Sequence, residues 1–245
     1  MPDKSHWWLR KGESLIKLNS FDEARECFQK AIGINPDSSS TVSAIWVNRG
    51  LELLNNDEYD RAGICFREAV ELDKGPAEYL VEKLLEKGDE FFGNDEHDKA
   101  KACYHEAAGI NPTDEDGAIV ERFVQRGEDF LDDWMHDEAE EWFREAVTLD
   151  KDAANDIAGK WIELGESQID DEDYDSATES FERALSFNPE CSADCAQKWM
   201  DEGKRLMDDE EFEEASRCFH EATKLDPDLE EPKPPVYRDN LRTSD

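Results

Sequence analysis

Basic residues are scarce in this sequence. Its 245 residues include 28 Lys and Arg against 64 Asp and Glu, which leaves a formal net charge of −36 at pH 7. A chain this acidic repels phosphate backbones and anionic lipid surfaces, so neither nucleic acid nor a membrane is an expected partner. A basic protein partner, bound cations and a salt-rich cytosol all remain compatible with the charge.

Long apolar runs are absent as well. No stretch approaches 18 consecutive apolar residues, and the first residues lack the apolar core of a signal peptide. The hydrophobic fraction is 38%, which suits an elongated fold better than a compact globule, while the seven Trp and twelve Phe argue against disorder. We therefore expect a folded, cytoplasmic protein.

What the sequence does contain is one pattern repeated six times. Each copy has a glycine with a large apolar residue four positions before it and an alanine twelve positions after it. An aromatic residue follows that alanine after four positions, and a second alanine comes three positions later. The glycines, 38 or 39 residues apart, are Gly12, Gly50, Gly88, Gly127, Gly165 and Gly203. Such regular self-similarity is the signature of a repeat architecture.

Each copy predicts two amphipathic helices, because apolar residues recur at helical spacing on both sides of the glycine. A polar turn such as 55–58 separates the two helices. Pairs such as Asn35-Pro36 end the second helix, since the residue before a proline leaves the helical region. The glycine and alanines are small where the paired helices approach closely, and the aromatic residues are expected to fill the space between neighbouring hairpins.

At these residues the sequence resembles the tetratricopeptide repeat family, whose pattern is Trp-x2-Leu-Gly-x2-Tyr, then Ala-x3-Phe, then Pro. The resemblance implies an all-α, right-handed superhelical solenoid of six antiparallel helix hairpins over residues 1–228. A proline-rich tail is expected at 229–245. The repeats are placed at about 5–38, 39–76, 77–115, 116–153, 154–191 and 192–228.

Two features depart from the family pattern. The period exceeds the family's 34 residues by about four, or one helical turn, and the extra residues are expected before the first helix of each repeat. The family's Leu before the glycine is replaced by a basic residue in four repeats, which suggests long side-chain stems lying over the core or a rotated first helix. These residues are Lys11, Arg49, Lys87 and Arg126.

Catalytic and metal-binding motifs are not apparent. The sequence has no nucleophile elbow, phosphate-binding glycine loop or histidine–carboxylate zinc motif. Cys191 and Cys195 lie one turn apart, but no further ligand completes a site. The aspartates at 171, 173 and 175 resemble part of a calcium loop, yet Ser176 stands where the loop needs glycine. We therefore predict no enzyme activity, cofactor or metal.

In the family the first helices line the concave surface, so the resemblance implies a binding face there. From the third repeat onward, the residues expected to face inward are mostly acidic, with an apolar lane beside them. The acidic candidates for partner binding are Glu82, Glu86, Asp89, Glu121, Glu128, Asp132, Glu163, Glu166, Asp170 and Asp201. The apolar candidates are Phe92, Leu131 and Ile169. Two other interpretations stay open: the acidity reflects the whole composition, or the apolar lane packs between adjacent first helices.

The resemblance and the charge together predict a protein–protein interaction scaffold or adaptor. It would bind a basic or amphipathic protein segment on the acidic concave face of repeats 3–6. The alternative is a structural subunit of a larger assembly that uses its ends or convex face. The family's best-known groove, a carboxylate clamp for chaperone C-termini, needs basic residues where Glu82 and Glu86 stand, so that activity is not expected.

Overall fold

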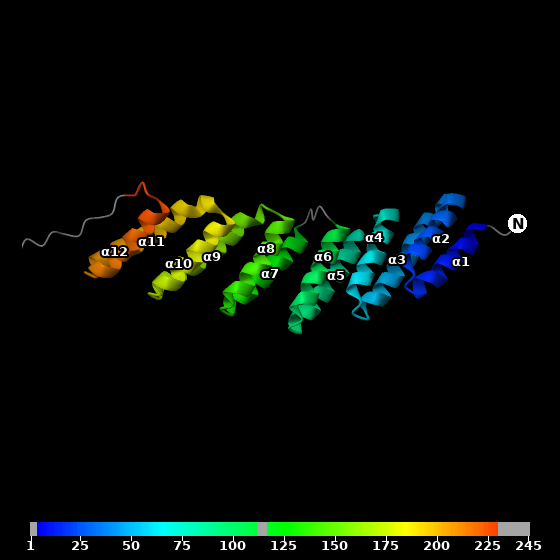
Figure 1. Ribbon diagram of the computed structural model, residues 1–245, viewed down its shortest axis with the longest axis horizontal. Coiled ribbons are helices and arrows are strands. Elements are labelled where there is room, and N and C mark those ends of the chain that lie inside the picture. Colours follow the sequence, from blue (N-terminus) through cyan, green and yellow to red (C-terminus); the bar gives the residue numbers. More distant parts are fainter. Residues whose placement is uncertain (1–3, 112–116, 230–245) are drawn as a thin grey trace, which may run out of the picture. The chain divides into compact units, whose positions relative to one another are not determined.

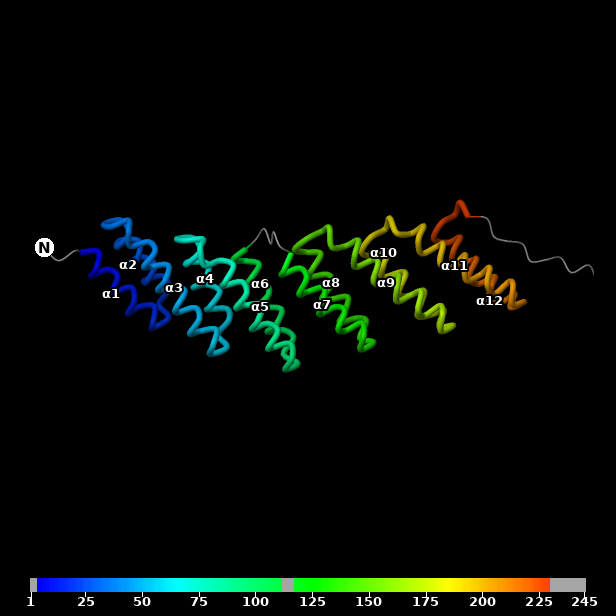
Figure 2. The backbone as a smooth tube through the Cα atoms, turned by 180° about the vertical axis from the view of Figure 1, so that it is seen from behind, coloured from blue at the N-terminus to red at the C-terminus, as the bar shows by residue number. Residues whose placement is uncertain are grey.

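The computed structural model describes residues 4–111 and 117–229, and in these ranges it consists of consecutive helix hairpins without strands (Figures 1 and 2). The chain divides into two compact units, Met1–Leu149 and Asp150–Asp245, which are described separately. The predicted tail lies, from residue 230 onward, outside the described residues.

Six hairpins make up the described parts of the two units. Those of the first unit are α1 (Lys4–Lys17) with α2 (Phe21–Ile34), α3 (Ser39–Leu54) with α4 (Tyr59–Leu72), α5 (Ala77–Gly93) with α6 (His97–Ile110), and α7 (Ala118–Asp132) with α8 (His136–Leu149). Those of the second unit are α9 (Ala153–Asp170) with α10 (Tyr174–Phe187), and α11 (Ser192–Asp208) with α12 (Phe212–Leu225). Short 3-10 turns, η1 (Pro36–Ser38) and η2 (Pro189–Cys191), precede α3 and α11. The predicted all-α fold of antiparallel hairpins is confirmed.

The extra residues of the long period lengthen the first helix of most hairpins instead of forming a separate segment before it. The second helices α2, α4, α6, α8, α10 and α12 all have 14 residues. The first helices α3, α5 and α9 have 16, 17 and 18 residues. The additional length is about one turn, so it extends the first-helix surface without changing the hairpin.

The core of each hairpin is built around its repeat glycine. A Cβ at Gly12 would lie 2.5 Å from Cε1 of Phe28, and a Cβ at each of the other five repeat glycines would overlap the equivalent ring. The Phe28 ring also packs on Trp46 of the next hairpin, with 5.6 Å between centroids, and Phe181 packs on Trp199 in the same way at 5.6 Å. The predicted roles of the small and aromatic residues are therefore confirmed.

Each hairpin turns through one residue in the left-handed region. These residues have φ between 60° and 67°, and they are Asn19, Asp57, Asp95, Trp134, Glu172 and Glu210. The next backbone amide then bonds back to the first helix, as Glu58 N does to Leu53 O at 2.9 Å. Asn and Asp tolerate this backbone region better than other non-glycine residues. The turns hold the two helices antiparallel and present the first-helix surface.

Candidate functional site

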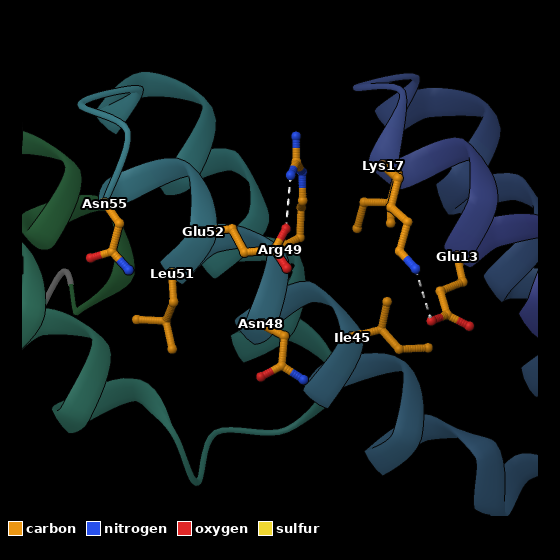
Figure 3. A pocket seen from close by; sticks show the side chains of 9 residues that line it. Glu13, Lys17, Ile45, Asn48, Arg49, Leu51, Glu52 and Asn55 are labelled. Atoms are coloured by element: carbon orange, nitrogen blue, oxygen red, sulfur yellow. Dashed lines mark hydrogen bonds and ion pairs between the residues drawn. The ribbon is translucent and has the colours of Figure 1, made fainter.

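The first helices of the first unit carry two grooves, and one of them lies between α1 and α3 (Figure 3). This groove has a volume of about 410 Å³, and its apolar lining includes Ile45 and Leu51. The exposed amides of Asn48 and Asn55 stand beside these residues.

The charges of the α1–α3 groove are paired. Lys17 Nζ lies 3.5 Å from Glu13 Oε1, and Arg49 Nη1 lies 2.8 Å from Glu52 Oε2 (Figure 3). The groove therefore offers amides and apolar surface with little net charge. Its residues have no common charge, so none of them is among the predicted acidic candidates for partner binding.

The second groove lies between α5 and α7 and has a volume of about 480 Å³. Its α5 side combines three carboxylates, those of Glu78, Glu82 and Glu86, with the apolar side chains of Val81 and Leu85. The three glutamates are exposed and stand four residues apart, which places them along one face of the helix. Two sequence-predicted candidates, Glu82 and Glu86, thus line an acidic groove.

Two basic residues reduce the charge of this groove: Arg122 of α7 is part of its lining, and Lys83 pairs with Glu86. Lys83 Nζ donates a hydrogen bond to Glu86 Oε2 at 2.5 Å, and that bond raises the pKa of Lys83. Glu86 nevertheless keeps 56% of its side chain exposed. It therefore remains accessible to a second cation.

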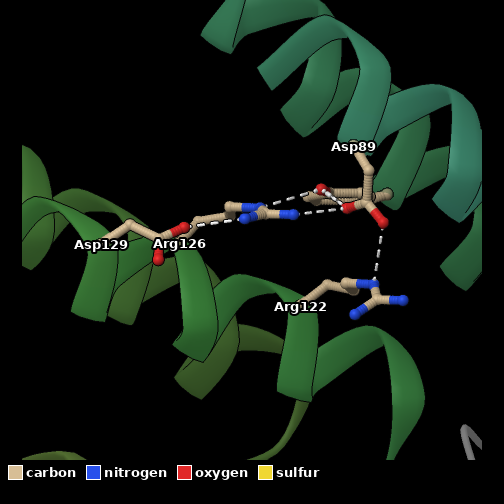
Figure 4. A network of polar contacts seen from close by, with 5 residues as sticks. Asp89, Arg122, Arg126 and Asp129 are labelled. Carbon is tan, nitrogen blue, oxygen red and sulfur yellow. Dashed lines mark hydrogen bonds and ion pairs between the residues drawn. The ribbon is translucent and has the colours of Figure 1, made fainter. Parts of the chain in front are cut away.

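Asp89, the next predicted acidic candidate, lies in a closed polar network (Figure 4). Its carboxylate accepts hydrogen bonds from Tyr104 Oη at 2.6 Å and from Arg126 Nη2 at 2.8 Å, and Arg122 Nε lies 3.3 Å away. Arg126 also contacts Asp129 at 2.7 Å. Two guanidinium groups thus balance two carboxylates, and the acidic surface of α5 is interrupted at Asp89.

The network also shifts the titration of its members. Burial raises the pKa of Tyr104, and the hydrogen bond to Asp89 raises it further. The pKa of Arg126 is raised as well: burial opposes this, but the bonds to Tyr104, Asp89 and Asp129 outweigh it. Both groups therefore keep their protons at neutral pH, and the network stays electrically balanced.

Phe92 lies between the third and fourth hairpins. Its ring centroid is 5.7 Å from that of Phe130 and 5.4 Å from that of Trp142, and the Arg126 guanidinium covers the ring at 4.5 Å. These contacts favour the packing interpretation of the apolar lane at this position. Leu131, in the same lane on α7, is partly buried.

The remaining acidic candidates on α7 differ in accessibility. Glu121 and Asp132 are exposed at opposite ends of the helix, whereas Glu128 is partly buried. The network of Asp89, Arg122, Arg126 and Asp129 adjoins the α5–α7 groove, because Arg122 is also part of the groove lining. The predicted acidic face of the first unit is therefore not continuous, because the charge of Asp89 is balanced.

In the second unit the candidates of α9 and α11 are partly paired. Glu163 and Asp170 are exposed, while Glu166 Oε2 lies 2.6 Å from Lys198 Nζ of α11. Asp201 accepts from Lys204 at 3.1 Å and from Gln197 at 2.7 Å.

Ile169 is only 4% exposed. Its side chain belongs to the core of the second unit, so its position also favours the packing interpretation of the apolar lane.

Other chemistry is not assembled in the described residues. Within 4–111 and 117–229, no group of three His, Cys, Asp or Glu side chains could hold a metal ion. Asp173, from the calcium-like sequence, instead caps α10, where it accepts from the backbone and hydroxyl of Ser176 at 3.2 and 2.7 Å. Every helix in these ranges is too short or too polar to cross a bilayer.

Tetratricopeptide repeat models match residues 7–38, 43–76 and 161–191. The chain is similar to the crystal structure of MamA, at 17% identity and a TM-score of 0.26, over 73% of this chain and 94% of that one. No curated protein matches the sequence.

Two further structures belong to proteins described as having these repeats. One is the C-terminal part of a TPR repeat-containing protein from Cytophaga hutchinsonii, at 15% identity, a TM-score of 0.28, and coverage of 94% of this chain and 86% of that one. The other is YrrB, described as a TPR protein with an unusual peptide-binding site, at 20% identity, a TM-score of 0.23, and coverage of 82% and 93%.

The matched segments lie on the hairpins α1–α2, α3–α4 and α9–α10. The same contact between a repeat glycine and an aromatic ring recurs in the other three hairpins. Three of the six described hairpins therefore match tetratricopeptide repeat models, and the other three share the core contact of the matched ones.

Proposed function

We propose that this chain is a protein-interaction scaffold, as its matches to tetratricopeptide repeat models suggest, and that it binds a basic or amphipathic protein segment on the first helices of its third to sixth repeats. The observation that carries the proposal is the groove between α5 and α7, where Glu78, Glu82 and Glu86 stand beside Val81 and Leu85. The proposed role is non-catalytic. We also propose a cytoplasmic location, because all six cysteines are buried free thiols and the cytoplasm keeps thiols reduced.

The groove has the two components that a basic amphipathic segment needs. Its carboxylates attract cations over a distance of about 10 Å at 0.1 M salt, which raises the association rate. Val81 and Leu85 are each 7% exposed and form the floor of the groove, so they offer a small apolar contact to a leucine-like residue of the partner, which lowers the dissociation rate. The exposed Glu163 and Asp170 of α9 are a second acidic surface of the same kind in the other unit.

A charge-reversal pair tests the groove directly. The variant E82K/E86K changes the net charge by +4 at two exposed groove residues. Its matched control is E71K/E179K, because Glu71 of α4 and Glu179 of α10 are exposed on second helices. The probe is a fluorescently labelled amphipathic peptide of lysine and leucine, and its binding is followed by anisotropy at several salt concentrations.

The groove variant is expected to weaken binding by about tenfold at low salt and to reduce the salt dependence, while the control changes affinity much less. Equal losses in the two variants would mean that the peptide senses only the net charge. The alternative function, a structural subunit of a larger assembly, predicts a stoichiometric native partner whose binding is indifferent to E82K/E86K.

A further inference from the structure

The turn between α7 and α8 differs in composition from the other five hairpin turns. In those turns, the left-handed residue is always polar: Asn19, Asp57, Asp95, Glu172 or Glu210. The residue after it, which precedes the second helix, is also polar: Ser20, Glu58, Glu96, Asp173 or Glu211. The α7–α8 turn has Trp134 and Met135 at these two positions. The other five turns therefore show that polar residues at these two positions are sufficient to form the turn.

The fold of the described residues gives no reason for this pair. Trp134 has φ of 61°, a backbone region that a bulky aromatic residue rarely adopts. Trp134 is 67% exposed and Met135 is 41% exposed, so burial of their apolar surface does little to offset the unfavourable backbone conformation of Trp134. The centroid of the Trp134 ring lies 6.1 Å from that of the neighbouring His136 ring. Two large apolar side chains are thus presented to solvent at the tip of one hairpin.

The charge around this tip indicates what it could bind. Exposed carboxylates flank the pair on both sides in the chain, and these are Asp132, Asp133, Asp137 and Glu138. An exposed indole attracts Lys and Arg through its π face, and nearby carboxylates strengthen that attraction. Met is a flexible apolar side chain that adapts to varied partners. The complementary ligand is a segment with cationic side chains next to apolar ones.

We propose that Trp134 and Met135 form a docking tip for a protein segment that presents Lys or Arg beside apolar side chains. The tip would be a second site for the same kind of partner, a basic or amphipathic protein segment, and its proposal rests on the proposed function to that extent. It is a separate surface, however: it lies at the α7–α8 turn, and the α5–α7 groove is lined by neither residue. Trp residues of this kind often provide a large share of binding energy at interfaces.

The repeats themselves supply the test variant. The substitution W134N/M135S installs the Asn-Ser pair of the first hairpin turn and leaves the net charge unchanged. Asn also suits the left-handed backbone better than Trp, so the melting temperature should stay the same or rise. The control is W7S, because Trp7 is the other strongly exposed tryptophan of the described residues, at 58%.

Two labelled peptides of equal charge serve as probes: an amphipathic lysine–leucine peptide, and an oligolysine without apolar residues. W134N/M135S should weaken binding of the lysine–leucine peptide by about tenfold and binding of oligolysine much less, because oligolysine loses only the cation–π contact with Trp134. W7S should bind both peptides as the unmodified chain does.

Two results would overturn the proposal. Unchanged affinity of W134N/M135S for the lysine–leucine peptide would show that the tip takes no part in binding. A melting temperature several degrees lower would show that Trp134 and Met135 pack within the folded chain. The groove variant E82K/E86K separates this proposal from the proposed function, since loss in that variant alone supports the groove and removes the tip.

Discussion

Arg49 Nη2 donates a hydrogen bond to Asn19 Oδ1 at 2.7 Å, and so links α3 to the left-handed turn of the preceding hairpin. Lys87 repeats this relationship one hairpin later, with its Nζ 2.7 Å from Oδ1 of Asp57. The side chains of Arg49 and Lys87 are only 16% and 14% exposed. The basic residue that replaces the family's Leu before these glycines is therefore a polar link between consecutive hairpins.

A double-mutant cycle at Arg49 and Asn19 measures this link. R49M removes the guanidinium, and N19G removes the amide while it keeps a residue that accepts positive φ. Because a hydrogen bond with one charged partner contributes about 1.5–3 kcal/mol, we expect a coupling free energy of about 1–2 kcal/mol in urea unfolding. Additive effects of the two substitutions would show that the contact does not stabilise the stacking of the hairpins.

Two glycines of α9 should respond to alanine with opposite signs. A Cβ at Gly165 would lie 2.6 Å from Cε1 of Phe181, whereas a Cβ at Gly159 would have no heavy atom within 4 Å beyond its chain neighbours and the adjacent backbone of its own helix. G159A should therefore stabilise by about 0.5–1 kcal/mol through helix propensity. G165A should destabilise by about 1–3 kcal/mol, because the aromatic ring must move.

Thermal and urea unfolding of the two variants would measure this difference. Each variant is the other's control, since both make the same chemical change on one helix. Stabilisation by both substitutions would contradict the close contact between α9 and α10 at Gly165.

Glu202 should make the second unit sensitive to acid. It is 6% exposed, and its carboxylate accepts bonds from Arg205 at 2.7 and 2.8 Å and from Tyr174 Oη at 2.9 Å. The bonds from Arg205 hold the pKa of Glu202 below its ordinary value of 4.5, against the opposing effect of burial, and the bond from Tyr174 contributes in the same direction. A lowered folded-state pKa stabilises the fold above the unfolded-state value, and this contribution is lost as the pH falls through the folded-state pKa.

The measurement is the difference in unfolding free energy between the unmodified chain and E202Q. This difference should be largest near neutral pH and should shrink as the pH falls below about 4.5, because glutamine cannot titrate. Comparing the two proteins at each pH cancels the titration of the other acidic groups. A difference independent of pH would mean that the Glu202 carboxylate is not preferentially charged in the folded state.

Glu106 should change the pH dependence of stability in the direction opposite to Glu202. Burial raises its pKa, although its ion pair with Arg67 lowers it in part. A raised folded-state pKa gives a contribution that is present at low pH and lost as the pH rises. The free energy of unfolding of E106Q should therefore rise relative to that of the unmodified chain as the pH increases from about 4.5 through the raised pKa of Glu106. This is the reverse of the change expected for E202Q.

The sequence alone determined the helices and the contacts inside each hairpin. Apolar spacing, polar turns and terminal prolines are local signals, so they predicted six hairpins without knowledge of how these pack. The pairing of Gly12 with Phe28 was also predictable, because both positions recur in every repeat at a constant separation.

The tertiary structure decided which candidate residues remain available to a partner. Asp89 looked like part of a continuous acidic face, but Arg122 and Arg126 of the next hairpin balance its charge. Helical periodicity tells which face of its own helix a residue occupies. It does not tell which side chain of another hairpin lies opposite, because that depends on the rotation and translation set by packing. For the same reason, only the tertiary structure shows that Phe92 packs against Trp142 of the next hairpin and that the charges of the groove between α1 and α3 are paired.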